Sequence, residues 1–311
     1  MEWLLVAAGL GFLLVAGDLL VKGAVNLSLR LGIPALIVSL TVVAFGTSAP
    51  ELLVSVQAVL TGAPGIALGN VVGSNTANIL LVLGLPAIIS GIAAGTDCRK
   101  SYVQMIAATA LFISLCFLGP LTWWHGLILL AALAAMLVWA ARTAMAHRAN
   151  GEVAEVEGAD PDLPGWKIAG SLVLGLVGLP LGADLLIRGA TTIARDFGMS
   201  DEVIGLTLVA LGTSLPELAT TVVAAWRKHT DVIMGNVIGS NMFNLLGIIG
   251  IAVLVGPIPV DPQMLRFDLW VMAAAALVLA PFVMRGWRMG RRWGVVLSAL
   301  YVVYIAVVLA G

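Results

Sequence analysis

Two copies of one short motif carry residues that could bind a cation. Glu51 and Glu217 each lie inside a long apolar run, in the motifs Gly-Thr-Ser-Ala-Pro-Glu-Leu at 46–52 and Gly-Thr-Ser-Leu-Pro-Glu-Leu at 212–218. A carboxylate at membrane depth is costly, so it points to a function. Two such carboxylates, one in each half of the chain, predict a cation site where two repeats meet.

The same motif predicts a break in its helix. Pro50 and Pro216 lack a backbone N–H, and each ring clashes with the carbonyl four residues earlier, at Gly46 or Gly212. The break should free carbonyls within 44–47 and 210–213, and such backbone is tolerated at membrane depth only where it lines a buried site. Carbonyls, hydroxyls and carboxylates together form an all-oxygen cavity, which hard cations such as Ca²⁺ and Na⁺ favour.

A second motif, Gly-Asn-x-x-Gly-Ser-Asn-x-x-Asn, is repeated at 69–78 and 235–244. Ser74 and Asn78 are four residues apart and share a helix face, as do Ser240 and Asn244. Their oxygens could complete the shell of a cation. For the two serines, close helix packing explains the small side chain equally well, whereas the two asparagines are predicted as ligands.

Composition makes the chain a multi-spanning membrane protein. Hydrophobic residues make up 60% of the chain and charged residues 11%, with a mean hydropathy of +1.07. A soluble domain has about 25% charged residues. The net charge of -1 and the two scattered cysteines indicate neither nucleic-acid binding nor a metal cluster. We expect the lipid bilayer as surroundings, no cofactor and no obligatory protein partner.

The apolar segments predict an all-α membrane protein with ten transmembrane helices. They lie at 3–22, 33–60, 65–91, 101–118, 122–142, 166–187, 203–226, 231–255, 267–284 and 293–310. The halves align without a gap at an offset of 166 residues; Asp18 matches Asp184, for example. The predicted domains are a first five-helix repeat at 1–142, an acidic flexible linker at 143–165 and a second repeat at 166–311. Five is an odd number, so the repeats must be inverted, with broken helices at the central site.

Basic residues predict the orientation in the membrane. With the N-terminus outside, every Lys and Arg residue except Arg188, Arg195 and Arg266 falls on the inner side. This bias follows the positive-inside rule. It predicts both termini outside and the linker in the cytoplasm. Because the N-terminus has no basic region or cleavage site, the first apolar segment is expected to remain as a span.

Two further acids have a simpler explanation. Asp18 and Asp184 are each followed four residues later by a basic residue, Lys22 or Arg188. This spacing predicts an ion pair within each helix near the membrane edge rather than an additional cation site.

With these motifs, the chain resembles the cation/Ca²⁺ exchanger superfamily, and within it the prokaryotic sodium/calcium exchangers. The resemblance covers nearly the whole chain and implies a central site with Glu51, Glu217, Asn78 and Asn244 as the main ligands. It also implies flanking Na⁺ sites formed by further hydroxyls and carbonyls, from Thr47, Ser48, Thr213, Ser214, Ala44 and Ala210. Many members place Asp at one or both of the positions held by Asn78 and Asn244. This departure weakens a K⁺-cotransporting interpretation.

The resemblance implies Na⁺/Ca²⁺ antiport that extrudes Ca²⁺ across a bacterial or archaeal cell membrane. Alternating access would keep segments 2, 3, 7 and 8 fixed and move segments 1 and 6. A Ca²⁺/H⁺ antiporter with the same glutamate pair is the main alternative. A passive channel is disfavoured because channels usually build a pore from rings of subunits. An intramembrane hydrolase would also use paired acids, but no other catalytic constellation is present, so we expect no enzyme.

Overall fold

The structure, a computed structural model, describes residues 2–93, 95, 98–149, 160–197 and 210–310. These residues are nearly all α-helical, apart from a ribbon of two short strands. In this ribbon β1 (Ile92–Ala93) and β2 (Arg288–Met289) pair antiparallel, with Ile92 opposite Met289. The prediction of an all-α fold is confirmed.

The helices of the two halves follow in similar order, and η marks a π-helical turn. The first half contains α1 (Glu2–Leu31), α2 (Ala35–Val38), η1 (Ser39–Val43), α3 (Ala44–Thr47), α4 (Ala49–Leu60), α5 (Pro64–Ala77), η2 (Asn78–Val82), α6 (Gly84–Ile89), α7 (Cys98–Cys116) and α8 (Trp123–Ala149). The second half contains α9 (Gly165–Asp196), α11 (Ala210–Thr213), α12 (Leu215–Trp226), α13 (Thr230–Met242), η4 (Phe243–Ile248), α14 (Ile249–Val255), η5 (Met264–Asp268), α15 (Leu269–Val278), α16 (Ala280–Met284) and α17 (Arg291–Ala310).

Seven helices among the described residues are long and apolar enough to cross a membrane, and a bent helix pair makes an eighth candidate. Two of the ten predicted spans are not among these eight. The segment at 101–118 is helical as α7, whose first turn carries Arg99 and Lys100. The segment at 203–226 lies partly outside the described residues. The protein is a multi-pass membrane protein, and the count of ten remains a prediction.

The helix breaks that Pro50 and Pro216 predict are present. Ser48 separates α3 from α4, and the two parts of this span are bent by 42°. Ser214 separates α11 from α12 in the same way. Each proline lies in the first turn of the following helix, where its missing N–H costs no hydrogen bond.

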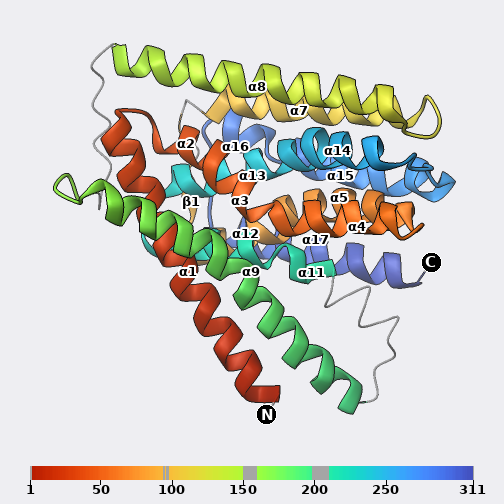
Figure 1. Cartoon of the computed structure of the whole chain (residues 1–311), viewed down its shortest axis with the longest axis horizontal. Helices are drawn as coiled ribbons and strands as arrows, with labels where there is room; N and C mark the ends of the chain where they lie inside the picture. Colours follow the sequence, from red (N-terminus) through yellow and green to blue (C-terminus); the bar gives the residue numbers. More distant parts are fainter. Residues whose placement is uncertain (1, 94, 96–97, 150–159, 198–209, 311) are drawn as a thin grey trace.

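The longest helices, α1 and α9, lie side by side and cross the remaining bundle obliquely (Figure 1). Glycines bring their backbones together: a Cβ added to Gly175 would lie 2.8 Å from the backbone nitrogen of Leu20, and one added to Gly182 would lie 2.9 Å from that of Leu13. Small residues permit this close packing in membranes, where apolar burial gives little drive between helices.

The second-half span formed by α13, η4 and α14 runs through the centre of the molecule. Every residue from 232 to 250 is buried. The helix contacts α2, η1, α3, α7 and α12. Because both repeated motifs lie on or beside this span and its counterpart α5, the fold gathers them at its core.

Candidate functional site

The two intramembrane carboxylates are fully enclosed. Glu51 lies in the first turn of α4 and is 1% exposed, and Glu217 lies in the first turn of α12 and is 0% exposed. The broken helices place each carboxylate at a helix N-terminus, whose partial positive charge stabilises an anion. Among the described residues, no Lys, Arg or His forms an ion pair with either carboxylate.

Hydroxyl groups from both halves reach Glu217. Ser48 Oγ donates a hydrogen bond to Glu217 Oε1 at 3.1 Å, and Ser240 Oγ donates to the same oxygen at 3.3 Å. The other oxygen, Glu217 Oε2, is buried and has no hydrogen-bond partner in the described structure. The same is true of Glu51 Oε2. Each carboxylate therefore keeps one buried oxygen available to a ligand.

Asn78 and Asn244 are held by reciprocal bonds between the two halves. Asn78 Nδ2 donates to Asn241 Oδ1 at 3.0 Å, and Asn244 Nδ2 donates to Asn75 Oδ1 at 3.0 Å. These bonds use the amide N–H groups. Asn78 Oδ1 and Asn244 Oδ1 are buried and unpartnered within the described part of the chain.

The threonines of the first motif are held by the first asparagine of the second motif. Thr47 Oγ1 donates to Asn236 Oδ1 at 3.1 Å, and Thr213 Oγ1 donates to Asn70 Oδ1 at 3.3 Å. Each bond joins the two halves and has its counterpart 166 residues along the chain. Because the hydroxyl hydrogen is used in this bond, a lone pair of each threonine oxygen is left to face a cation.

Three of the four remaining predicted residues, Ser74, Ser214 and Ala44, lie in the same buried region. Ser74 and Ser214 are buried, and their hydroxyl oxygens have no hydrogen-bond partner among the residues described. The carbonyl of Ala44 accepts the N–H of Ser48 at 3.0 Å and has a second lone pair. Ala210 begins α11, next to the second break. The twelve predicted residues thus come from the two broken helices and the two helices that pack beside them.

The chemistry of this set is that of a hard-cation site. Four buried oxygens, two from carboxylates and two from amides, lack partners in the described structure. An unpaired buried acceptor costs about 1–3 kcal/mol, and a charged one costs more. Among the described residues, no three His, Cys, Asp or Glu side chains cluster in a way that could hold a metal ion. The set therefore suits Ca²⁺ or Na⁺ better than a transition metal.

Four positioning asparagines are not predicted from the sequence. Asn70, Asn75, Asn236 and Asn241 belong to the repeated motif, whose predicted ligands are only Asn78 and Asn244. The repetition of these asparagines in both halves indicates that they have a role. Repetition does not indicate that each asparagine bonds to the opposite half, because that contact depends on how the two repeats pack together.

One predicted ion pair is wrong and its counterpart is confirmed. Arg188 and Asp184 of α9 form the expected pair at 2.9 Å. Asp18 instead pairs with Arg227, which follows the end of α12. Arg227 Nε and Nη2 both contact Asp18 Oδ1, and this contact between helices replaces the local pair with Lys22.

Comparison with known proteins agrees with this geometry. The sequence pattern of the family described as sodium/calcium exchanger protein matches residues 1–142 and 167–310. The chain is 32% identical to the sodium/calcium exchanger MaX1 of Methanosarcina acetivorans, over 98% of each protein. It is 33% identical to the inner membrane protein YrbG of Escherichia coli, over 97% of this chain and 95% of YrbG.

Solved structures of one exchanger share the fold. A structure of the sodium-calcium exchanger NCX_Mj, soaked with Na⁺ and Sr²⁺, superposes with a TM-score of 0.85 at 33% identity, over 98% of this chain and 97% of the other. A structure of the same exchanger without Na⁺ and Ca²⁺ also gives 0.85. The inverted-repeat arrangement that the two motifs predict is therefore the fold of this chain.

Proposed function

Because the chain belongs to the sodium/calcium exchanger protein family, whose members are transporters and not enzymes, we propose that this antiporter of Ca²⁺ and a second cation is driven by Na⁺. Inward movement of Na⁺ would extrude Ca²⁺ from the cell. The observation that carries the proposal is the enclosed pair Glu51 and Glu217, each with one buried oxygen lacking a partner in the described structure. Two carboxylates balance the charge of one Ca²⁺.

In this proposal Ca²⁺ binds at the centre of the site. Glu51 Oε2, Glu217 Oε2, Asn78 Oδ1 and Asn244 Oδ1 would be its ligands, and the hydroxyls of Ser74 and Ser240 lie beside them. The four unpartnered oxygens supply part of the 6–8 oxygens that Ca²⁺ takes at about 2.3–2.6 Å. Waters and further carbonyls would complete the shell.

Na⁺ would bind at flanking positions built from neutral oxygens. Thr47 and Ser48, with the carbonyl of Ala44, would form one such position. Thr213 and Ser214, with the carbonyl of Ala210, would form the other. Neutral oxygens add little to a proton site, which needs only a titrating carboxylate, whereas a desolvated cation requires several. This argument favours Na⁺ over H⁺ as the coupling ion.

Exchange follows from the cost of an empty site. Unpaired carboxylates in a low-dielectric interior are strongly destabilising. The carrier would therefore cross between its two states only when Ca²⁺ or replacement cations neutralise Glu51 and Glu217. The oblique helices α1 and α9 would move, while the buried span of α13 and its counterpart α5 would stay fixed (Figure 1).

One close contact between the halves is relevant to alternating access. Gly235 of α13 is buried against α2 and η1, and Gly239 is buried against η1. The second-half counterpart of α2 and η1, residues 201–209, lies outside the described residues. In alternating access we expect the contact at α13 and the equivalent contact at α5 to open and close in turn.

The deciding experiment measures ⁴⁵Ca²⁺ uptake into proteoliposomes. An outward Na⁺ gradient at clamped pH should drive uptake, and a pH gradient without Na⁺ should not. Full uptake on the pH gradient alone would support a Ca²⁺/H⁺ antiporter instead. Uptake that needs no counter-ion would indicate a channel.

Threonine variants test where Na⁺ binds. Thr47→Val and Thr213→Val keep the shape but remove the hydroxyl, so they should raise the Na⁺ concentration needed for half-maximal exchange more than the Ca²⁺ concentration. Thr109→Val is the matched control, because Thr109 is also buried but bonds the carbonyl of Met105 in its own helix. Equal effects on both ions in the two site variants would contradict the flanking Na⁺ positions.

A further inference from the structure

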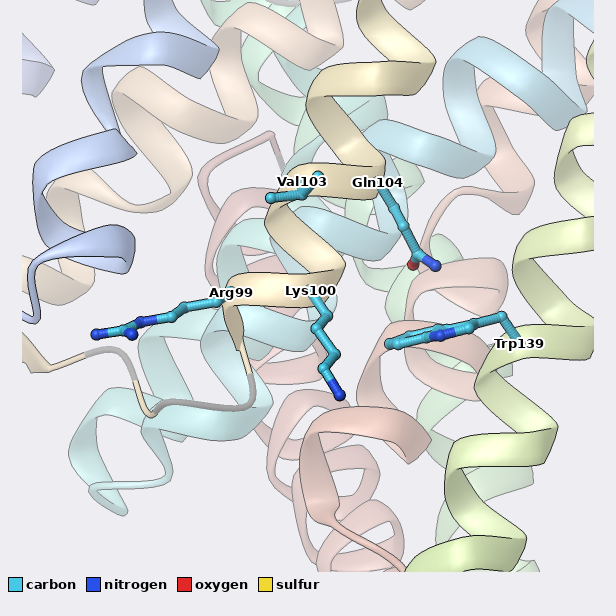
Figure 2. Close-up of a pocket in the computed structure, with 5 residues that line it drawn as sticks. All are labelled: Arg99, Lys100, Val103, Gln104 and Trp139. Atoms are coloured by element: carbon cyan, nitrogen blue, oxygen red, sulfur yellow. The ribbon is translucent and has the colours of Figure 1, made fainter.

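A hollow lies on the side of α7 that faces α8, outside the cation site. Its volume is about 260 Å³, and it is lined by Arg99, Lys100, Val103, Gln104 and Trp139. In Figure 2 Gln104 extends toward the indole of Trp139, Lys100 extends beside the two, and Arg99 extends away from Trp139 on the other side of the same turn. Four of the five residues come from the first two turns of α7 and one comes from α8.

No described residue neutralises the two cations of this hollow. Arg99 and Lys100 are exposed, and within the described part of the chain neither forms an ion pair with a carboxylate. They also lie in the first turn of a 19-residue helix, whose N-terminus is the positive end of its dipole. Two positive side chains at that end repel the helix dipole, so a bound anion would relieve an unfavourable arrangement.

A second, independent feature points to a ligand. Gln104 Oε1 is buried and has no hydrogen-bond partner among the described residues. Gln104 follows Lys100 by four residues, so both side chains lie on one face of α7. The amide can therefore bond a group that the ammonium of Lys100 also touches. A ligand that satisfies both residues carries an anionic group and, close to it, a hydrogen-bonding group.

The surroundings of the hollow suit a lipid. Trp139 is half-buried at its wall, and tryptophan is enriched where headgroups meet the hydrocarbon region. Val103 offers an exposed apolar surface to the first methylenes of an acyl chain. With the orientation that the basic residues predict, the N-terminus of α7 and the C-terminal part of α8 both lie at the inner leaflet. Basic pockets between helices on the cytoplasmic side bind anionic headgroups.

We propose that this hollow binds the headgroup of an anionic glycerophospholipid, and specifically of phosphatidylglycerol. Lys100 contacts the phosphate, and Arg99, on the other side of the turn, adds positive charge beside the same headgroup. Gln104 accepts a hydrogen bond from a glycerol hydroxyl, and Trp139 packs against the glycerol backbone. The headgroup of a zwitterionic lipid carries a positive charge beside its phosphate, and this charge would be repelled by Arg99 and Lys100. Phosphatidylcholine therefore binds more weakly. The site is independent of which ion drives transport.

The test uses the purified full-length protein after removal of lipid in detergent. Native mass spectrometry counts the bound lipid, and thermal unfolding reports stabilisation, with phosphatidylglycerol, phosphatidylcholine or inorganic phosphate added separately. Phosphatidylglycerol should bind and raise the unfolding temperature. Inorganic phosphate and phosphatidylcholine should do neither at the same concentration. Stabilisation by inorganic phosphate equal to that by the lipid would overturn the proposal in favour of a small-anion site.

A pair of double variants separates this site from general attraction to basic residues. Arg99→Gln with Lys100→Gln should weaken phosphatidylglycerol binding by roughly tenfold or more, since each basic residue near an anionic surface contributes appreciably. Arg291→Gln with Arg292→Gln is the control: these two exposed arginines also begin a helix, α17, at the predicted inner side. Equal losses in the two double variants would contradict a specific site, as would equal binding of both lipids by the wild type.

Gln104→Leu gives an independent measurement at the same site. The change keeps the helix and the charges but removes the hydrogen-bonding amide. It should lower phosphatidylglycerol binding by a smaller factor, about threefold, without lowering the unfolding temperature of the lipid-free protein. An unchanged affinity would remove Gln104 from the site and restrict recognition to charge alone.

Discussion

Two close helix contacts depend on glycine but lie in different parts of the molecule. At the central span, a Cβ added to Gly235 of α13 would lie 2.6 Å from the carbonyl oxygen of Leu36, and one added to Gly239 would lie 2.4 Å from that of Leu40. Between the oblique helices, one added to Gly175 of α9 would lie 2.8 Å from the backbone nitrogen of Leu20. Glycine therefore allows close backbone packing both at the cation site and between the helices proposed to move.

The hydrogen bonds at the site repeat between the halves, with one difference in geometry. At the centre, the bond from Asn78 to Asn241 is mirrored by that from Asn244 to Asn75. At the carboxylates, Ser48 donates to Glu217 at 3.1 Å, whereas its counterpart Ser214 faces Glu51 without the geometry of a hydrogen bond in the described structure. The two repeats thus contribute the same groups to one central site, with an asymmetry at the carboxylates.

The largest expected effect tests whether the two carboxylates are equivalent despite this asymmetry. Glu51→Gln and Glu217→Gln should each lower Ca²⁺ exchange by about 100-fold or more, because losing one partner of a buried charged site is strongly unfavourable. Proteoliposome flux measures the effect, and thermal unfolding checks the fold. Asp184→Asn, the same chemical change on a half-exposed residue of α9, should exchange normally. Near-normal flux in either Gln variant would remove that glutamate from the site.

Matched glycine variants test the close contact at the central span. Gly235→Ala should destabilise the protein by about 1–3 kcal/mol, since its Cβ meets a backbone oxygen that cannot move away easily. Gly11→Ala in α1, whose added Cβ meets no atom within 4 Å, should leave the unfolding temperature near that of the wild type or higher, because Ala favours helix over Gly. Thermal unfolding measures both effects. Equal destabilisation by the two variants would contradict the importance of this contact.

The sequence predicted the features whose cause is local. The helix breaks follow from Pro50 and Pro216, and the ligands follow from repetition of one motif in both halves. The structure places eleven of the twelve predicted residues in one buried region and gives Ala210 as the start of α11, and their role as ligands remains a prediction. The partner of Asp18 could not be predicted by the same means. The spacing to Lys22 is a local rule, and Arg227 becomes a neighbour only when α12 docks on α1.

A smaller effect is expected from the positioning asparagines. Asn75→Leu and Asn241→Leu should each weaken Ca²⁺ affinity by roughly tenfold, because the amide of Asn244 or Asn78 would lose its acceptor and could turn its N–H toward the cation. The Ca²⁺ concentration for half-maximal exchange measures the effect. Asn75→Asp or Asn241→Asp keeps an acceptor oxygen and should restore most of the affinity. Loss of affinity in only one of the two Leu variants would show that the central bonds are not functionally equivalent.

The smallest effect concerns the ion pair that has no mirror image. Asp18 and Arg227 join α1 to the end of α12, whereas Asp184 pairs within α9. Both side chains of the first pair are about two-fifths exposed, so breaking it should cost at most about 1 kcal/mol. If the pair holds α1 in the present arrangement, Asp18→Asn should favour the opposite state and change the Ca²⁺ affinity measured from the two sides by up to about fivefold in opposite directions. Asp18→Arg combined with Arg227→Asp should restore the wild-type ratio, and Asp184→Asn should not change it. A parallel change in both affinities, or none, would mean that the pair only stabilises the local helix contact.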